Sequence, residues 1–181
     1  MELPVSIIKK CKKGDTKAQQ TLYQFYSPVM YGVCLRYFPN ADIAKDILQD
    51  GFVKVFNSIR SFRFEGSIEG WIRKIMVNTA LEFLRKSKEE KEVEITEAFA
   101  VEDSEIRIET EYKQLLSMIT ELPNQYRIVF NLYAIECYSH SEIGEMIGIT
   151  ESTSKSNYSR AKAILREKLN DLRKIDKYAF L

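Results

Sequence analysis

The chain has 181 residues, of which 45% are apolar, and its 27 Lys and Arg nearly balance its 26 Asp and Glu. This composition excludes a chain disordered throughout, and the length suits one domain or two small ones. Three scattered cysteines without a CxxC pair argue against a disulfide framework, and a single histidine, His140, argues against a metal site. With no signal peptide and no apolar run near the roughly 18 residues of a membrane-spanning helix, we expect a cytoplasmic protein without membrane insertion or cofactor.

The charges are segregated along the chain. Residues 1–86 hold 14 Lys and Arg against 8 Asp and Glu, residues 87–111 hold 3 against 10, and residues 112–181 hold 10 against 8. The middle segment has few aromatic residues and no clear period, which is typical of a linker. We therefore predict an N-terminal domain over 1–86, an acidic flexible linker over 87–111 and a C-terminal domain over 112–181.

Two helices are predicted in the first half of the N-terminal domain. Asp15 or Thr16 can cap the first, for which we expect a break or kink at Pro28. The second carries aspartates every four residues, so one side of it is lined by Asp42, Asp46 and Asp50 beside Gln49. Such a row of like charges is mildly unfavourable without a cationic partner, and the alternative is a merely solvated acidic face.

The stretch from residue 61 to 86 interleaves aromatic and basic residues around the only tryptophan, Trp71. Two glycines and the lack of a helical period predict a loop over 62–70, and a helix begins at Trp71. Aromatic rings, cations and an amide are the groups that hold single-stranded nucleic acid. The candidate residues are Phe62, Arg63, Arg73, Lys74 and Asn78. The alternative is an aromatic core beside a solvated basic face.

The C-terminal domain carries the strongest local pattern. An amphipathic helix over 112–122 precedes a second helix that starts at Pro123. Ser139 and Glu142 fit a capping box, Gly148 fits the end of that short helix, and a long helix follows from residue 151 to about 175. This is helix-turn-helix spacing, with the small Gly144 where two helices cross. The alternative is an ordinary helical hairpin.

Both halves of the chain resemble bacterial sigma factors of the small extracytoplasmic-function (ECF) class. The second region of that family is similar to DIAKDILQDGFVKVF and SFRFEGSIEGWIRKIMVNTALEFLRK, and the fourth region to ELPNQYRIVFNLYAIECYSHSEIGEMIGITESTSKSNYSRAKAILREKL. The resemblance implies an all-α fold of two small helical domains joined by an acidic linker, the second a helix-turn-helix. It also implies an alternative sigma factor, not an enzyme, that binds core RNA polymerase, recognises two promoter elements and melts promoter DNA.

The resemblance further implies roles for individual residues. The helix with Asp46, Gln49 and Asp50 corresponds to the one that docks on a coiled coil of the largest polymerase subunit. An unstacked base of the minus-ten element is captured by the segment that matches Phe62, Arg63 and Asn78, and Arg73 and Lys74 suit contact with the DNA backbone. The positions that read the minus-thirty-five element match Lys155, Ser156, Ser159 and Arg160.

This sequence departs from the family pattern at three positions. Phe64 stands where the usual loop has a small residue, Ser154 where the recognition helix has an apolar one, and Asn157 where it has a cation. The promoter sequence therefore does not carry over, and we expect looser packing of the helix-turn-helix.

Two other functional classes and one further partner remain open from the sequence. A conventional helix-turn-helix regulator that binds an operator leaves the 61–86 stretch and the aspartate row without a purpose. An enzyme would need a nucleophile with its base, or a set of metal ligands, and neither is present in the sequence. A cognate anti-sigma factor is a further candidate partner, whose existence the sequence leaves open.

Overall fold

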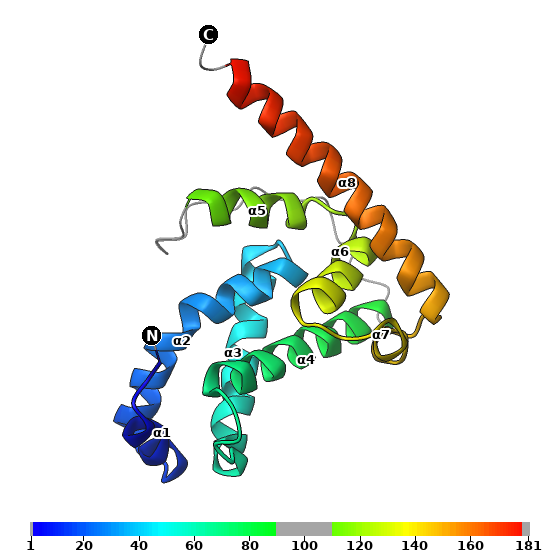
Figure 1. Cartoon of the computed structure of the whole chain (residues 1–181). Helices are drawn as coiled ribbons and strands as arrows, with labels where there is room; N and C mark the ends of the chain where they lie inside the picture. The colour runs from blue at the N-terminus through cyan, green and yellow to red at the C-terminus, as the bar shows by residue number, and fades with distance from the viewer. Residues whose placement is uncertain (1, 90–109, 179–181) are drawn as a thin grey trace. The chain divides into compact units, whose positions relative to one another are not determined.

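A computed structural model describes residues 2–89 and 110–178 (Figure 1). Its regular elements are all helical over these ranges, which confirms the predicted all-α class. The chain divides into two compact units, Met1–Glu92 and Val93–Leu181. The predicted linker, 87–111, lies mostly outside the described residues, so its bounds stay a prediction. Within the described ranges, each helix is too short or too polar to cross a membrane.

The N-terminal unit is a bundle of helices around an apolar centre. Its elements are α1 (Val5–Lys12), α2 (Thr16–Tyr37), α3 (Ala41–Ser58), the 3₁₀ turn η1 (Ile59–Ser61) and α4 (Ile68–Glu89). The three long helices pack against one another, and α1 packs on α2. Leu22 of α2, Ile47 of α3 and Ile72 of α4 are almost completely buried. Burial of each such side chain contributes about 1.5–3 kcal/mol.

Short polar side chains determine where α2 and α3 begin. The Asp15 carboxylate accepts a hydrogen bond from the Ala18 amide at 2.9 Å, as predicted, and the Asn40 side chain caps α3 in the same way. Of the break or kink predicted at Pro28, the break is wrong, because α2 continues through Pro28 to Tyr37. Proline removes only one backbone donor, and the packing of α2 against α3 and α4 holds the helix together across that position.

Helix α4 is covered on two sides. The Met76 side chain of α4 fills the space beside Gly51 of α3, where a Cβ atom would clash with the Met76 sulfur. On another side α4 packs against α2. Leu81, which the helical period places away from the main apolar face, is therefore only 2% exposed. Contact with two neighbours makes the buried arc of α4 wider than a single stripe.

The C-terminal unit is organised around its long last helix. Its elements are α5 (Thr110–Thr120), α6 (Asn124–Phe130), the π-helical turn η2 (Asn131–Ile135), α7 (His140–Ile147) and α8 (Glu151–Tyr178). Helix α8 packs against α5, α6 and α7, and its residues Ala161 and Leu165 join Met118 and Leu122 in a core. The π-helical turn was not predicted, since its residues continue the apolar period of α6.

A buried cation connects α5 to α6. The Arg127 guanidinium donates hydrogen bonds to the carbonyl oxygens of Thr120 at 2.9 Å and Leu122 at 3.1 Å, and to the Asn124 side chain at 3.1 Å. These carbonyls lie at the end of α5, where a helix leaves acceptors without intrahelical donors. Burial lowers the pKa of Arg127 to about 10, so the side chain remains a cation at neutral pH.

The predicted helix-turn-helix is confirmed in its local details. The Ser139 hydroxyl accepts from the Glu142 amide, and the Glu142 carboxylate accepts from the Ser139 amide, so the capping box is complete. Gly148 ends α7 in the left-handed region, with φ 71°. A Cβ atom at Gly144 would lie 2.6 Å from the carbonyl oxygen of Ile149, which explains why only glycine fits at this crossing.

Candidate nucleic-acid interfaces

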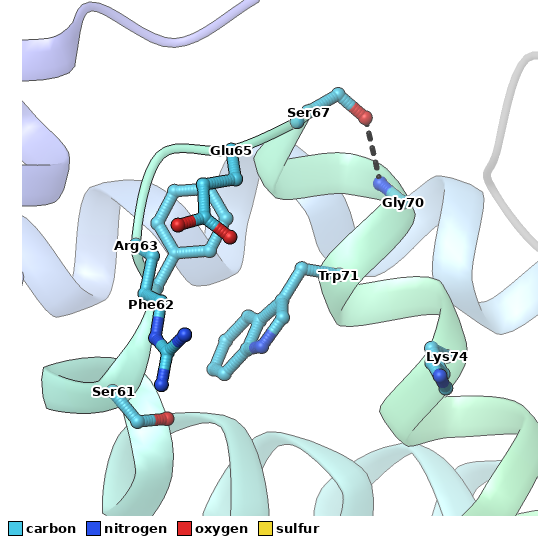
Figure 2. A pocket seen from close by; sticks show the side chains of 9 residues that line it. Ser61, Phe62, Arg63, Glu65, Ser67, Gly70, Trp71 and Lys74 are labelled. Atoms are coloured by element: carbon cyan, nitrogen blue, oxygen red, sulfur yellow. Dashed lines mark hydrogen bonds between the residues drawn. The ribbon is translucent and has the colours of Figure 1, made fainter.

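A pocket opens between the loop after η1 and the start of α4 (Figure 2). Its volume is about 440 Å³. The lining residues are Ser61, Phe62, Arg63, Glu65, Gly66, Ser67, Gly70, Trp71 and Lys74. Figure 2 shows the Trp71 indole on the α4 side and Phe62, Arg63 and Glu65 on the loop side. The pocket thus combines the aromatic rings of Phe62 and Trp71 with the cationic donors Arg63 and Lys74. The Glu65 carboxylate adds one acceptor.

The loop that forms this pocket is held by aromatic contacts. The Phe62 ring lies 5.0 Å from the Phe64 ring and 5.5 Å from the Trp71 ring, between their centroids. At the end of the loop, the Ser67 hydroxyl accepts a hydrogen bond from the Gly70 amide at 3.0 Å and caps the first turn of α4. Because both ends of the loop are fixed to helices, the pocket is preformed in the free protein.

The structure brings together only some of the residues predicted to bind the minus-ten element. Phe62, Arg63 and Lys74 line the pocket, whereas Arg73 and Asn78 do not. Arg73 is half-buried and donates to the Glu69 carboxylate at 2.9 Å. Asn78 is exposed about two turns beyond Trp71 on α4, roughly 10 Å along the helix axis.

Phe62 was expected to offer an exposed ring for stacking, but its ring is buried. It is only 5% exposed, because Phe64 and Trp71 lie against it, and so it forms part of the pocket wall. Trp71 is half-buried, and Phe64 is 39% exposed. The rings accessible to a ligand are therefore those of Trp71 and Phe64, and the expectation of an aromatic core holds for Phe62 alone.

The aspartate row lies on the solvent face of α3. Asp46, Gln49 and Asp50 are all exposed, while the opposite face of the helix is buried against α2 and α4. Val53 continues this exposed face one turn further and is 58% exposed. Val53 was not predicted as part of this face, although its spacing from Gln49 and Asp50 places it on the same side.

The four predicted recognition residues lie exposed on the first turns of α8. Lys155 pairs with the Glu151 carboxylate at 2.6 Å, and Ser156 donates to the Thr153 carbonyl at 3.0 Å. Ser159 is exposed beside Arg160. The Arg160 guanidinium lies over the Tyr126 ring at 6.0 Å and donates to its hydroxyl at 3.3 Å. These side chains present donors and hydroxyls on one surface, which suits base edges in a major groove.

Comparison with known proteins decides the family. Residues 22–90 match the Sigma-70 region 2 family, and residues 112–165 match Sigma-70, region 4. The chain is 31% identical over 180 residues to the ECF RNA polymerase sigma factor SigW of Bacillus subtilis, across 91% of this chain and 96% of that relative. The chain belongs to the ECF sigma factor family.

Further relatives agree with this assignment. The ECF RNA polymerase sigma-E factor of Haemophilus influenzae is 28% identical over 181 residues, across 92% of this chain and 95% of that protein. The fold is shared with the sigma factor RpoE from Bartonella quintana, solved in complex with the anti-sigma factor NepR. That match has a TM-score of 0.55 at 20% identity and covers 83% of this chain and 96% of the other. This ECF factor is thus an alternative sigma factor, whose region 2 match holds the pocket and the aspartate row.

Ser154 and Asn157, the two departures in the recognition helix of this ECF factor, are both buried, with 0% and 4% of their surface exposed. The Ser154 hydroxyl lies 2.9 Å from Nδ1 of His140, whose ring stacks on Tyr133 with centroids 4.1 Å apart. Burial, followed by the charge of Lys155, lowers the pKa of His140, and Glu151 opposes this. The polar residue is accommodated because its hydroxyl has a partner.

A lysine that was not predicted as a site residue reaches the pocket loop of this sigma factor. Lys12, the last residue of α1, donates from Nζ to the Phe62 carbonyl oxygen at 2.5 Å. The same ammonium lies 5.1 Å from the centre of the Phe64 ring. Lys12 precedes residues 22–90, which match region 2, and no local pattern in the sequence connects it to a loop 50 residues away.

Proposed function

We propose that this sigma factor binds core RNA polymerase through α3, reads two promoter elements and melts promoter DNA, without catalysing a reaction of its own. One observation carries the proposal: the exposed carboxylate row and the preformed pocket lie on one compact helical unit. The row and the pocket are built on α3 and α4, which pack against each other with Met76 beside Gly51. Docking on polymerase would therefore also place the pocket. The protein would act in the cytoplasm, where polymerase and promoter DNA are found.

The charge of α3 supports its proposed role as the polymerase-binding surface. In the described part of the chain, Asp46 and Asp50 have no ion-pair partner, while Asp42 is 3.8 Å from Lys45. Unpaired like charges on one face gain from a cationic surface on a partner, which steers association. Val53 adds an apolar contact at the end of the row. We propose Asp46, Gln49 and Asp50 as polymerase-binding residues, with Val53 beside them.

The pocket supports the proposed capture of an extruded base. A volume of about 440 Å³ lies within the roughly 300–1,000 Å³ typical of small-molecule sites and has room for one base. Extrusion of a base costs a few kcal/mol, and stacking returns about 1–3 kcal/mol. Trp71 supplies a stacking surface in the pocket, while Arg63 and Lys74 supply cations. Arg73 lies beside the pocket on α4 and Asn78 lies further along that helix, and both would contact neighbouring nucleotides of the displaced strand.

The surface of α8 supports the proposed reading of the minus-thirty-five element. Lys155, Ser156, Ser159 and Arg160 are exposed within its first three turns, and Asn157, where a cation is usual, is buried. The base sequence read by this helix would therefore differ from that of relatives with a cation there. Tyr126 holds Arg160 in place before DNA binds, which lowers the entropy lost on binding.

An anti-sigma factor is a second proposed partner. The Bartonella relative was solved with the anti-sigma factor NepR, and we extend that kind of partner to this chain as a proposal.

Run-off transcription with purified core polymerase tests the proposed function. We expect promoter-dependent initiation when this protein is the only sigma factor present. A conventional helix-turn-helix regulator would give no transcript without another sigma factor, although it would shift an operator fragment on its own. Template without a promoter serves as the control, and absence of initiation on a library of promoter fragments would reject the proposal.

A further inference from the structure

The feature that carries a further inference is the pair of contacts made by Lys12. Its half-buried side chain extends from the end of α1 to the loop of the pocket, where the ammonium meets the Phe62 carbonyl and the Phe64 ring. A charged donor strengthens a hydrogen bond, and an ammonium over an aromatic face adds an attraction of its own. Lys12 does not line the pocket itself. Lys12 can therefore affect the pocket only through its contacts with the loop.

The loop needs such a contact because Phe64 has an unfavourable backbone conformation. Its φ is 62°, in the left-handed region that bulky residues rarely adopt. Residues with this conformation persist only where their surroundings hold them. Here the Phe64 ring contacts both the Lys12 ammonium and the Phe62 ring. The two contacts favour the one loop conformation in which Phe64 turns back over Phe62.

The same contacts continue to the pocket. Phe64 touches Phe62, and Phe62 touches Trp71, whose indole lines the cavity. We propose that Lys12 is a positioning residue for promoter melting: it fixes the loop that forms the base pocket, and so makes α1 part of the melting machinery. This inference rests on the proposed function of the pocket. A loop already fixed before DNA binds loses less conformational entropy when a base enters.

The first experiment measures the loop in the free protein. Trp71 is the only tryptophan, so its fluorescence reports on the pocket without a label. The variants are Lys12→Met, which keeps the stem and removes the donor, Lys12→Arg, which restores a cationic donor, and Lys13→Met, an exposed neighbour, as control. We expect acrylamide to quench Trp71 more strongly in Lys12→Met only. Equal quenching in all three variants would overturn the inference.

The second experiment measures open-complex formation by holoenzyme on duplex promoter DNA. We expect Lys12→Met to lower the rate of open-complex formation by about tenfold, equivalent to about 1.4 kcal/mol, with recovery in Lys12→Arg and no change in Lys13→Met. Binding to core polymerase should stay unchanged, and a template mismatched across the minus-ten element should keep part of the defect, because the loop itself is altered.

Two further outcomes separate the possible failures. Trp71→Ala removes a pocket wall directly and serves as the reference for the proposed function. If Trp71→Ala opens DNA as well as wild type, the proposed function of the pocket fails. If Trp71→Ala is impaired but Lys12→Met is not, only the inference about Lys12 fails. If Lys12→Met weakens DNA binding equally on all sequences and lowers its salt dependence, while Trp71 quenching stays normal, Lys12 contacts a phosphate. That result would also overturn the inference.

Discussion

Nδ1 of His140 lies 2.9 Å from the hydroxyl oxygen of Ser154, a residue with no exposed surface. The contact connects the first residue of α7 to the recognition helix, and the His140 ring stacks on Tyr133 at the same time. At this position, which is usually apolar in the family, Ser154 thus makes a buried hydrogen bond. This relationship leads to a prediction about pH.

Acidification should destabilise the C-terminal unit. The pKa of His140 is lowered from 6.5 by burial and by Lys155, against the opposing charge of Glu151, so the unfolded chain binds the proton more readily. The contribution of neutral His140 to the free energy of unfolding is therefore complete above about pH 6.5 and declines as the pH falls below that value. We expect a lower unfolding midpoint in urea at pH 5.5 than at pH 7.5.

The matched variant for this prediction is His140→Phe, which keeps an aromatic ring but cannot titrate. Its stability should not change between pH 7.5 and 5.5, since Glu142 and Glu151, whose pKa values are lowered, lose their contributions only below about 4.5. Because the chain has one histidine, an NMR titration of its ring needs no assignment. A ring pKa at or above 6.5 would contradict the prediction.

Substitution of Gly144 should cost more than substitution of Gly148. A methyl group at Gly144 would meet the Ile149 backbone, which cannot move away as a side chain can, and such overpacking costs about 1–3 kcal/mol. Gly148 has open space around it, so Gly148→Ala meets only the left-handed backbone penalty of about 1–2 kcal/mol. Gly148→Asn should be milder still, because asparagine tolerates that conformation. Denaturant unfolding of the three variants would rank them, and a Gly144→Ala protein as stable as Gly148→Asn would refute the argument.

Charge reversal in the aspartate row should weaken binding to core polymerase. We expect Asp46→Lys with Asp50→Lys to lower the affinity by about tenfold or more, because like charges across an interface cost several kcal/mol. Helical content should stay the same, since both side chains are exposed. The control is Glu145→Lys with Glu167→Lys, which changes the net charge equally on exposed positions of the other unit. Titration of labelled core should show unaltered affinity in the control pair only.

Loss of Asn78 should affect melting and leave assembly intact. Asn78 is exposed on α4, so Asn78→Ala has little effect on the fold. If Asn78 contacts DNA only in the open state, the variant should slow opening of duplex promoter while it binds core normally, because a contact absent before opening cannot affect the encounter. A template mismatched across the minus-ten element should rescue it in part. Phe62→Ala is a poorer test, since its ring is buried, and wild-type opening by Asn78→Ala would remove the residue from the interface.

Arg160 and Arg166 should differ in what they contribute to binding of the minus-thirty-five element. Arg160→Ala should lose about 1–3 kcal/mol of discrimination at particular base pairs, because a bidentate arginine reads a base edge. Arg166 is exposed almost two turns further along α8, so Arg166→Ala should weaken all sequences alike. Binding across a library of upstream elements would separate the two effects. Equal losses on every sequence would show that Arg160 contacts only the backbone.

Features that depend on residues a few positions apart were determined by the sequence alone. The capping box of Ser139 and Glu142 and the Asp15 cap follow from side chains that bond within three residues of their own position. The left-handed end of α7 follows from the absence of a side chain at Gly148. The exposed aspartate row follows from the helical period in the same way. The ECF family was likewise predicted, because the order of these local patterns is specific.

Features that depend on packing between distant segments were decided only by the tertiary structure. Leu81 is buried because two helices cover α4, Phe62 is in the wall of the pocket because Phe64 and Trp71 lie against it, and Ser154 is satisfied by His140 from another helix. Lys12 reaches a carbonyl 50 residues away. No periodicity or local propensity records such contacts, since they arise only when the helices close on a common core and bring remote side chains within hydrogen-bonding distance.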